Sequence, residues 1–250
     1  MTTLMDAVAN RLPADTIRLD TRVESLAQSP SGAWQMKTSG PHVDSITADG
    51  VVIALPARHA ARLLDAMDAK LAADLSTIKY GSCALASFGF RRDQIQHPLD
   101  GFGVVIPLVE RRKILSATFT STKYPGRAPD DHVLIRTYIG GGCQPELLEQ
   151  DDDELVAMAH QELVELLGVQ GQPVLTHINR QQNAMPQYHV GHLDLKQRIT
   201  DRVDELKGIV LAGNSLQGVG IPQCIQSAEA AAESLITSLN SARPIHSSPP

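Results

Sequence analysis

The glycine-rich segment at residues 213–222 has the residue types best suited to hold a ligand. It follows an apolar run at 208–213 and precedes an alanine-rich run at 225–239, so we expect it to connect a buried strand to a helix. Glycine lets a backbone approach a ligand closely, and free N–H groups at a helix start attract negative charge. Pro222 suits the first helical turn, where its missing N–H costs nothing. A ligand site and a tight connection without a ligand both stay open on this evidence.

The two common nucleotide-binding fingerprints are missing from the sequence. Residues 218–223 read GVGIPQ and residues 101–103 read GFG, so neither stretch completes G-x-G-x-x-G, and there is no P-loop. The acidic run at 151–154 has Asp151 and Glu154 in capping-box positions, which favours a helix N-terminus over a metal site.

Histidine and cysteine side chains give no clear catalytic motif. His189 and His192 could form a metal pair, but no Cys, Asp or Glu stands at ligand spacing, so a hydrogen-bonded structural histidine is favoured. Cys143 and Cys224 lack the context of a nucleophile and are expected to be small buried apolar residues. The glycines at 140–142 indicate a flexible loop rather than a phosphate cradle. We therefore assign no catalytic residue and no metal ligand.

Composition limits the class of protein. The 250 residues include 22 Lys and Arg against 28 Asp and Glu, a formal net charge of −6, which argues against a nucleic-acid-binding surface. No apolar run approaches the roughly 18–20 residues of a membrane-spanning helix. The three cysteines favour neither a disulfide framework nor a zinc site, and the start lacks the basic residues of a secretory signal. We expect a cytoplasmic protein, with peripheral membrane contact left open and the oligomeric state unassigned.

Apolar periodicity and turn residues predict an α/β layout. The unbroken apolar run at 51–55 is typical of a strand buried on both faces, usually a parallel one. The other predicted strands lie at 17–19, 21–26, 33–37, 83–90, 103–107, 114–119, 132–139 and 208–213. The predicted helices lie at 4–12, 61–71, 151–168, 194–208 and 225–239.

Two stretches in the second half of the chain carry a family resemblance. Residues 185–192 read MPQYHVGH, and residues 211–225 read LAGNSLQGVGIPQCI. Together they resemble the C-terminal half of the protoporphyrinogen/coproporphyrinogen oxidase family, FAD-dependent porphyrinogen-oxidising enzymes of haem biosynthesis within the monoamine-oxidase-like flavoproteins. Weaker likeness at 21–26 and 49–56 extends the resemblance over about residues 1–240.

The resemblance implies an α/β (α+β mixed) fold, with a partial FAD-binding Rossmann-like domain and an inserted mixed β-sheet substrate domain. The FAD-binding part would comprise residues 1–58 and 207–241, the substrate-binding domain residues 59–206, and a disordered tail residues 242–250. The resemblance also implies that the family's N-terminal half, which holds the dinucleotide fingerprint, is not in this chain.

The resemblance further implies where FAD would bind. Backbone groups of Val23 would contact the adenine, and the helix that opens near residue 221 would point its positive end at the N1/O2 edge of the flavin. The implied cofactor-binding residues are Val23, Gly213, Asn214, Val219, Gly220, Ile221 and Pro222.

The activity implied is FAD-dependent oxidation of a porphyrinogen, protoporphyrinogen IX or coproporphyrinogen III, to the porphyrin with oxygen as acceptor. The partner would be a flat tetrapyrrole bound over the middle strands. Two alternatives remain: a flavin amine oxidase or desaturase, and a non-catalytic remnant or interaction domain that lacks the dinucleotide-binding half.

Overall fold

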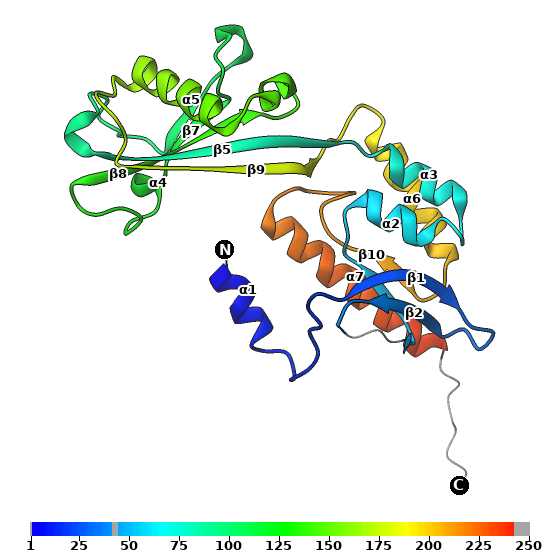
Figure 1. Ribbon diagram of the computed structural model, residues 1–250. Coiled ribbons are helices and arrows are strands. Elements are labelled where there is room, and N and C mark those ends of the chain that lie inside the picture. Colours follow the sequence, from blue (N-terminus) through cyan, green and yellow to red (C-terminus); the bar gives the residue numbers. More distant parts are fainter. Residues whose placement is uncertain (1, 42–44, 243–250) are drawn as a thin grey trace. The chain divides into compact units, whose positions relative to one another are not determined.

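The computed structural model describes residues 2–41 and 45–242, and these form two compact units (Figure 1). The first unit combines Met1–Ile78 with Tyr188–Pro250, and the second is Lys79–Gln187. Residues 59–78 and 188–206, which the expected boundaries place in the inserted domain, fall in the first unit. The tail expected at 242–250 lies outside the described residues except for the backbone of residue 242.

The first unit carries two small sheets. One is the antiparallel sheet β1-β2-β3, and the other is the parallel pair β4 and β10, in which Val51 lies opposite Ile209. The parallel pairing agrees with the expectation that the apolar run at 51–55 forms a parallel strand. The strands are β1 (Arg22–Gln28), β2 (Trp34–Ser39), β3 (Ser45–Ala48), β4 (Val51–Ile53) and β10 (Ile209–Leu211). The helices are α1 (Thr2–Ala9), α2 (Ala57–Leu64), α3 (Ala69–Thr77), α6 (His192–Glu205) and α7 (Ile221–Ala242).

The single tryptophan, Trp34, holds the segment of chain that leads into β10. Trp34 is 1% exposed, and its Nε1 donates a hydrogen bond of 3.2 Å to the carbonyl of Lys207. Gly208 follows with a φ of +81°, and a Cβ there would lie 2.8 Å from the same Nε1. Glycine is therefore required where the chain turns into β10.

The second unit is a five-stranded sheet with strand order β6-β7-β8-β5-β9, and every pairing in it is antiparallel. This corrects the expected mixed sheet. The long strands pair directly with their neighbours, so no parallel crossover is needed. Its elements are β5 (Tyr80–Arg91), β6 (Gly103–Val105), β7 (Ser116–Phe119), α4 (Thr120–Lys123), β8 (His132–Gly140), α5 (Asp152–Leu167) and β9 (Leu175–Pro186).

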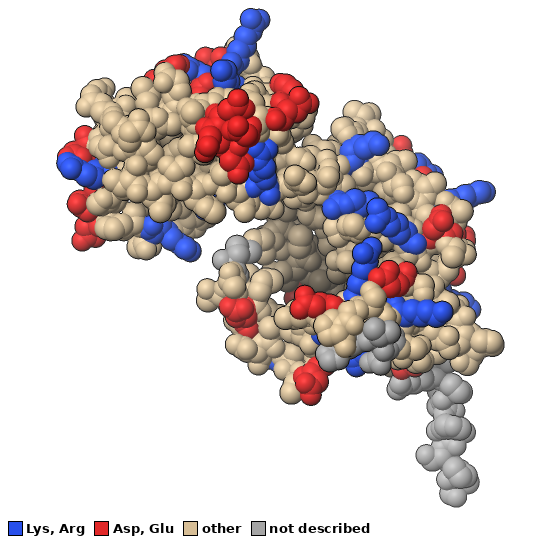
Figure 2. Space-filling model, in the orientation of Figure 1, with Lys and Arg blue, Asp and Glu red and all other residues tan. Residues whose placement is uncertain are grey.

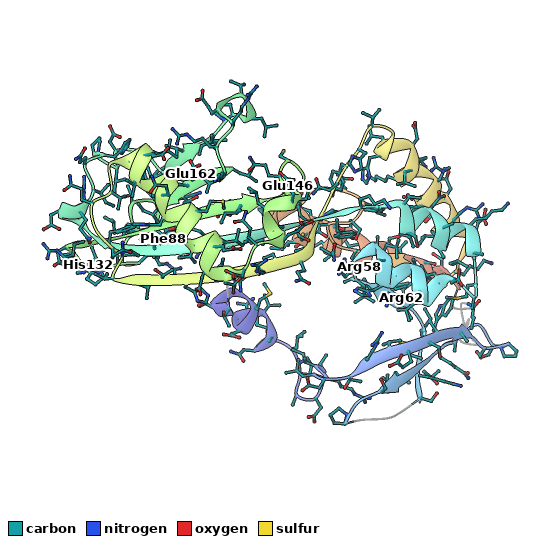
Figure 3. All side chains as sticks on the ribbon, turned by 45° about the horizontal axis from the view of Figure 1, so that its top comes forward. Arg58, Arg62, Phe88, His132, Glu146 and Glu162 are labelled. Atoms are coloured by element: carbon teal, nitrogen blue, oxygen red, sulfur yellow. The ribbon has the colours of Figure 1, made fainter. Side chains whose placement is uncertain are left out.

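Helix α5 packs its apolar face on this sheet. Leu155, Ala159 and Leu163 are fully buried in one cluster with Phe88 and Ile135 of the strands. The acidic run before it acts as a cap, as predicted: Asp151 accepts the N–H of Glu154 at 2.9 Å, and the carboxylate of Glu154 accepts the N–H of Asp151. Figure 3 labels Phe88 and Glu162 in this unit.

Several predicted elements differ from the structure. The helix expected at 61–71 is split into α2 and α3, because Asp68 adopts an extended conformation and caps α3. Residues 17–19 form no strand, and the helix expected to be capped near Asp194 begins at His192 after Gly191. Strand β4 is not buried on both faces, since Val52 is 41% exposed.

In the described part of the chain, no helix is both long and apolar enough to cross a membrane.

Candidate functional site

The predicted strand–glycine turn–helix is present, and it forms a loop between β10 and α7. Gly213 has a φ of +104° and Gly218 a φ of +67°, which are conformations that favour glycine. The helix begins at Ile221, and the N–H of Cys224 donates to the carbonyl of Gly220 at 3.0 Å. Residues 213–222, which contain all predicted cofactor residues except Val23, thus form one continuous loop and helix start.

Side chains from α6 and the turn before it hold the first half of the loop. The hydroxyl of Tyr188 donates to the carbonyl of Asn214 at 2.5 Å. Nε2 of His192 lies 2.9 Å from the carbonyl oxygen of Leu216. Further contacts are made by Lys196 Nζ with Gln217 Oε1, and by the N–H of Gly213 with Ser227 Oγ at 3.0 Å.

The second half of the loop presents backbone N–H groups without a protein acceptor. Among the described residues, no hydrogen bond is made by the N–H groups of Val219, Gly220, Ile221 or Gln223. The 22 residues of α7 place the positive end of a long helix dipole at the same point. This end of the loop is therefore suited to a group with negative charge or carbonyl-like oxygens.

Glycine at two loop positions makes room for a neighbouring side chain. A Cβ on Gly218 or Gly220 would clash with the side chain of Gln223, which lies against both backbones. Beside them, Val219 is 46% exposed and Ile221 is 41% exposed. These two apolar side chains could pack on a flat ring system at the surface of the loop.

The space beneath the loop is too small for such a ring system. The cavity there measures about 30 Å³, which suits a water molecule or two. A larger groove of about 400 Å³ runs beside the loop, and its lining includes Lys196, Gln217 and Gln223. A ligand of the size of a flavin would therefore use the outer face of the loop rather than the cavity under it.

Val23 lies apart from the loop in the sequence, within the same unit. It pairs with Thr38 of β2, and the pairing shifts between Val23 and Ser25, so that the ladder is irregular at Glu24. Such bulges redirect a strand and recur near binding sites. No hydrogen bond between described residues joins Val23 to residues 213–222.

A group of basic side chains gathers on α2 and the start of β1. Burial lowers the pKa of the His59 imidazole below 6.5. The guanidinium charges of Arg58, Arg62 and Arg22 lower the same pKa further, in that order. Arg58 and Arg62 are labelled on one helix in Figure 3, and Figure 2 shows Lys and Arg side chains over this region.

Histidine and cysteine candidates have clear environments. His192 is hydrogen-bonded to the carbonyl of Leu216 in the loop, as expected for a hydrogen-bonded structural histidine. Cys143 is exposed and Cys224 half-buried, so the expectation that both are buried is wrong. Both lie at turns or helix starts, where one side of the backbone faces solvent. Burial raises the pKa of the Cys83 thiol, which disfavours a reactive thiolate.

The sequence identified residues 185–192 as a motif but did not predict that they contact the glycine loop. Tyr188, His192 and Lys196 were not predicted as site residues, although all three contact the glycine loop. The sequence signal for these residues was that the motifs at 185–192 and 211–225 occur together. Their joint occurrence indicates that both belong to one structural unit, but it does not predict which side chains contact the loop. Ser227 carried no sequence signal, and Gln223 lies within the second motif but was not predicted as a site residue.

Comparison with known proteins gives consistent matches along almost the whole chain. The family model of flavin containing amine oxidoreductases matches residues 1–236. The coproporphyrinogen III oxidase of Bacillus subtilis is 30% identical over 241 residues, which cover 95% of this chain and 50% of that protein. The mitochondrial protoporphyrinogen oxidase of Nicotiana tabacum is 28% identical over 260 residues, with 96% and 50% covered.

Solved structures show the same fold. A crystal structure from Exiguobacterium sp. 255-15, provisionally identified as a protoporphyrinogen oxidase, has a TM-score of 0.82 at 28% identity and covers 96% of this chain and 51% of that chain. A UDP-galactopyranose mutase shares the fold at a TM-score of 0.73 and 14% identity. The chain spans about half the length of the curated relatives it matches.

Proposed function

The chain belongs to the flavin containing amine oxidoreductase family, and from this premise we propose that it takes part in FAD-dependent oxidation of a porphyrinogen to a porphyrin. FAD is the cofactor of the family, and oxidoreduction is its chemistry. The relatives named coproporphyrinogen III oxidase and protoporphyrinogen oxidase support the substrate class. The observation that carries the proposal is the row of N–H groups at the start of α7 that find no acceptor in the described part of the chain.

The residues present suit the flavin end of FAD. The N–H groups of Val219, Gly220 and Ile221 have no acceptor within residues 2–41 and 45–242, and Val219 and Ile221 add exposed apolar side chains beside those groups. Gly213, Asn214 and Pro222 shape the loop that presents them. Val23 is proposed to contact the adenine through its backbone. We assign no residue to the diphosphate, because the sequence has no G-x-G-x-x-G.

The start of α7 would stabilise negative charge at the flavin N1/O2 edge. A helix N-terminus favours a nearby anion by roughly 0.3–1 kcal/mol at an exposed position, and by more where water is excluded. The flat face of the ring would rest on the apolar side chains of Val219 and Ile221. In this way the chain's residues would bind the ring, orient it and favour negative charge at its N1/O2 edge.

Bound FAD would supply the two-electron acceptor for a reaction that removes six electrons and six protons from the porphyrinogen. With oxygen as the final acceptor, three rounds yield one porphyrin and three molecules of hydrogen peroxide. We propose that the unit built from residues 1–78 and 188–250 carries the flavin contacts. The sheet of residues 79–187 would carry contacts to the tetrapyrrole.

The test is porphyrin formation measured by fluorescence. The purified chain, supplied with FAD and either coproporphyrinogen III or protoporphyrinogen IX in oxygenated buffer, should produce porphyrin faster than the same mixture without protein. Peroxide should appear at about three molecules per porphyrin. Gly220→Val should abolish the increase, because its side chain clashes with Gln223 and displaces the loop.

Gly101→Ala is the matched control, since a Cβ at this position meets nothing within 4 Å and the glycine lies outside the loop. This variant should keep wild-type activity. Oxidation of amines with peroxide release but no porphyrin would point to an amine oxidase instead. Absence of turnover with every one of these substrates would contradict an enzymatic role of this chain.

A further inference from the structure

The geometry points to a positioning role for Tyr188 and His192: together they clamp the glycine loop so that the N–H groups before α7 face a bound flavin. This inference rests on the proposed function, because it assumes that FAD binds at residues 219–221. Neither residue is expected to touch the reacting atoms. The clamp acts through the backbone of the loop.

The aromatic rings of the two side chains stack on each other. Their rings stack with centroids 4.1 Å apart and an interplanar angle of 17°. From this stack, the Tyr188 hydroxyl reaches the carbonyl of Asn214 and His192 Nε2 reaches the carbonyl of Leu216. Stacking fixes each ring through the other, so both hydrogen bonds are held in place at little cost in side-chain entropy.

The hydrogen bonds that hold the loop lie at residues 213–217, before the proposed flavin contacts at residues 219–221. Gly213 is tied to Ser227 of α7, and Gln217 is tied to Lys196 of α6. No protein acceptor takes the N–H groups of residues 219–221 among the described residues. The first half of the loop is therefore fixed from two sides, while the N–H groups of the second half are not used in hydrogen bonds between described residues and can serve a ligand.

The clamp is not a by-product of capping α6. The N-cap of α6 is Gly191, with a φ of +87° and no side-chain cap. The backbone N–H of His192 donates to the carbonyl of His189 at 3.0 Å, so the helix start is completed without the imidazole. The side chain of His192 is therefore directed to the loop and contributes nothing to the helix end.

Two single substitutions isolate the hydrogen bonds from the ring stack. Tyr188→Phe removes one hydroxyl, and His192→Phe removes the ring nitrogens, while both leave an aromatic pair. Each variant should weaken FAD binding by about threefold to tenfold, because one hydrogen bond is worth up to about a tenfold change in affinity. FAD binding is measured by quenching of flavin fluorescence, and loop order by hydrogen exchange of residues 213–220.

The matched controls are Tyr124→Phe and His177→Phe, two exposed positions in the other unit. They should leave FAD affinity and loop exchange unchanged. His192→Gln keeps an N–H donor and should restore part of the affinity lost in His192→Phe.

Faster exchange confined to residues 213–220, together with weaker FAD binding, supports the clamp. FAD affinity equal to that of the wild type in both variants overturns it. Faster exchange at every amide of the unit would show a purely structural role and also overturns it, as does a wild-type chain that binds no FAD. Normal FAD binding without porphyrin formation contradicts the proposed substrate but leaves the clamp intact.

Discussion

The pKa of His59 responds to the positive charges of the basic group on α2 and the start of β1. Its ring is half-buried, and its pKa is held below 6.5 by burial and by three guanidinium charges. Two of these charges, Arg58 and Arg62, lie one helical turn apart on the same helix, where like charges repel each other. An imidazole in this position resists protonation because a positive charge there would add to the repulsion.

We predict that Arg62→Gln raises the pKa of His59 toward 6.5. Removal of one guanidinium charge lowers the cost of protonating the ring. An NMR titration of the His59 ring protons measures the shift directly. Arg127→Gln, an exposed change in the other unit, is the control and should leave the titration unchanged. A His59 pKa that is the same in Arg62→Gln and in the wild type would contradict the electrostatic cause.

The lowered pKa of His59 also determines how the stability of the protein changes with pH. Because the folded pKa of His59 lies below the unfolded value, the unfolded chain binds its proton first as the pH falls. The contribution of the neutral ring is therefore fully present above pH 6.5 and is lost as the pH falls below it. His59→Gln should show a smaller loss of stability than the wild type over this acidic range.

Asp68 combines a helix cap with an ion pair. Its Oδ1 accepts the N–H groups of Lys70 and Leu71, both at 2.9 Å, and its Oδ2 lies 2.8 Å from Arg202. The hydrogen bond from Leu71 is the main cause that lowers the pKa of this carboxyl below 3.8, and Arg202 lowers it further. The cap explains why the helix expected at 61–71 is interrupted.

We predict that Asp68→Ala lowers the free energy of unfolding by about 1–2 kcal/mol, because the α3 cap and the contact with Arg202 are both lost. Asp68→Asn should cost less, since the amide oxygen still caps the helix. Chemical denaturation at pH 7 measures both changes. Asp130→Asn, at an exposed site, is the control.

At acidic pH, the contribution of the Asp68 charge to stability can be distinguished from the contribution of its helix-capping hydrogen bonds. A depressed carboxyl pKa contributes stability that is present above pH 3.8 and is lost as the pH falls through the folded pKa. The difference between the wild type and Asp68→Asn should therefore shrink below pH 3.8. A difference that stays constant down to pH 2 would show that the charge of Asp68 contributes nothing.

Among the helices and strands, the sequence predicted correctly those for which the start, the end and the apolar pattern all indicate the same element. Helix α5 has a capping box at Asp151, a periodic apolar face and Gly168 at its end, and all three appear in the structure. The apolar runs at 51–55 and 208–213 also form strands, β4 and β10, and these pair in parallel, although Val52 of β4 is exposed. Each of these elements carries its own start, end and buried face in the sequence.

Strand β9 could not be predicted because its stability comes from its neighbour. Most of its twelve residues are exposed, and its sequence LTHINRQQNAMP has no alternation of apolar and polar positions. It pairs with β5 along almost its whole length, from Leu175 opposite Gly89 to Pro186 opposite Tyr80. Backbone pairing with a distant strand is invisible to a local pattern.

The end of α5 gives an element-scale prediction. Gly168 has a φ of +63°, and a Cβ there would lie 2.8 Å from Oε1 of Gln96. Gly168→Ala should lower the free energy of unfolding by about 1–3 kcal/mol, the usual cost of a left-handed conformation for a residue with a side chain. Gly101→Ala should change it by less than about 0.5 kcal/mol. Equal unfolding midpoints in urea for the two variants would contradict this explanation.

For the whole molecule, sequence motifs identified the glycine loop but not the contacts that hold it. Residues 213–222 follow each other in the chain, so their grouping was predictable. The bonds from Tyr188 and His192 depend on how α6 packs beside β10, which no spacing in the sequence determines. The compact units likewise divide at Ile78 and Tyr188, because α6 packs against β10, α3 packs against α6, and α2 packs against α3 and β1 within the first unit.

The division into units predicts where FAD should stabilise the protein. A ligand that binds only the folded form adds RT ln(1 + [L]/Kd), or about 2.7 kcal/mol at a hundredfold excess over Kd. If the flavin contacts lie in residues 1–78 and 188–250, FAD should slow hydrogen exchange in these segments, most strongly at 213–223. Slowly exchanging amides of the sheet at residues 79–187 should change little. ADP, which lacks the flavin ring, is the matched control ligand and should leave 213–223 unprotected. Protection by FAD that is confined to residues 79–187 would contradict the placement of the flavin on the glycine loop.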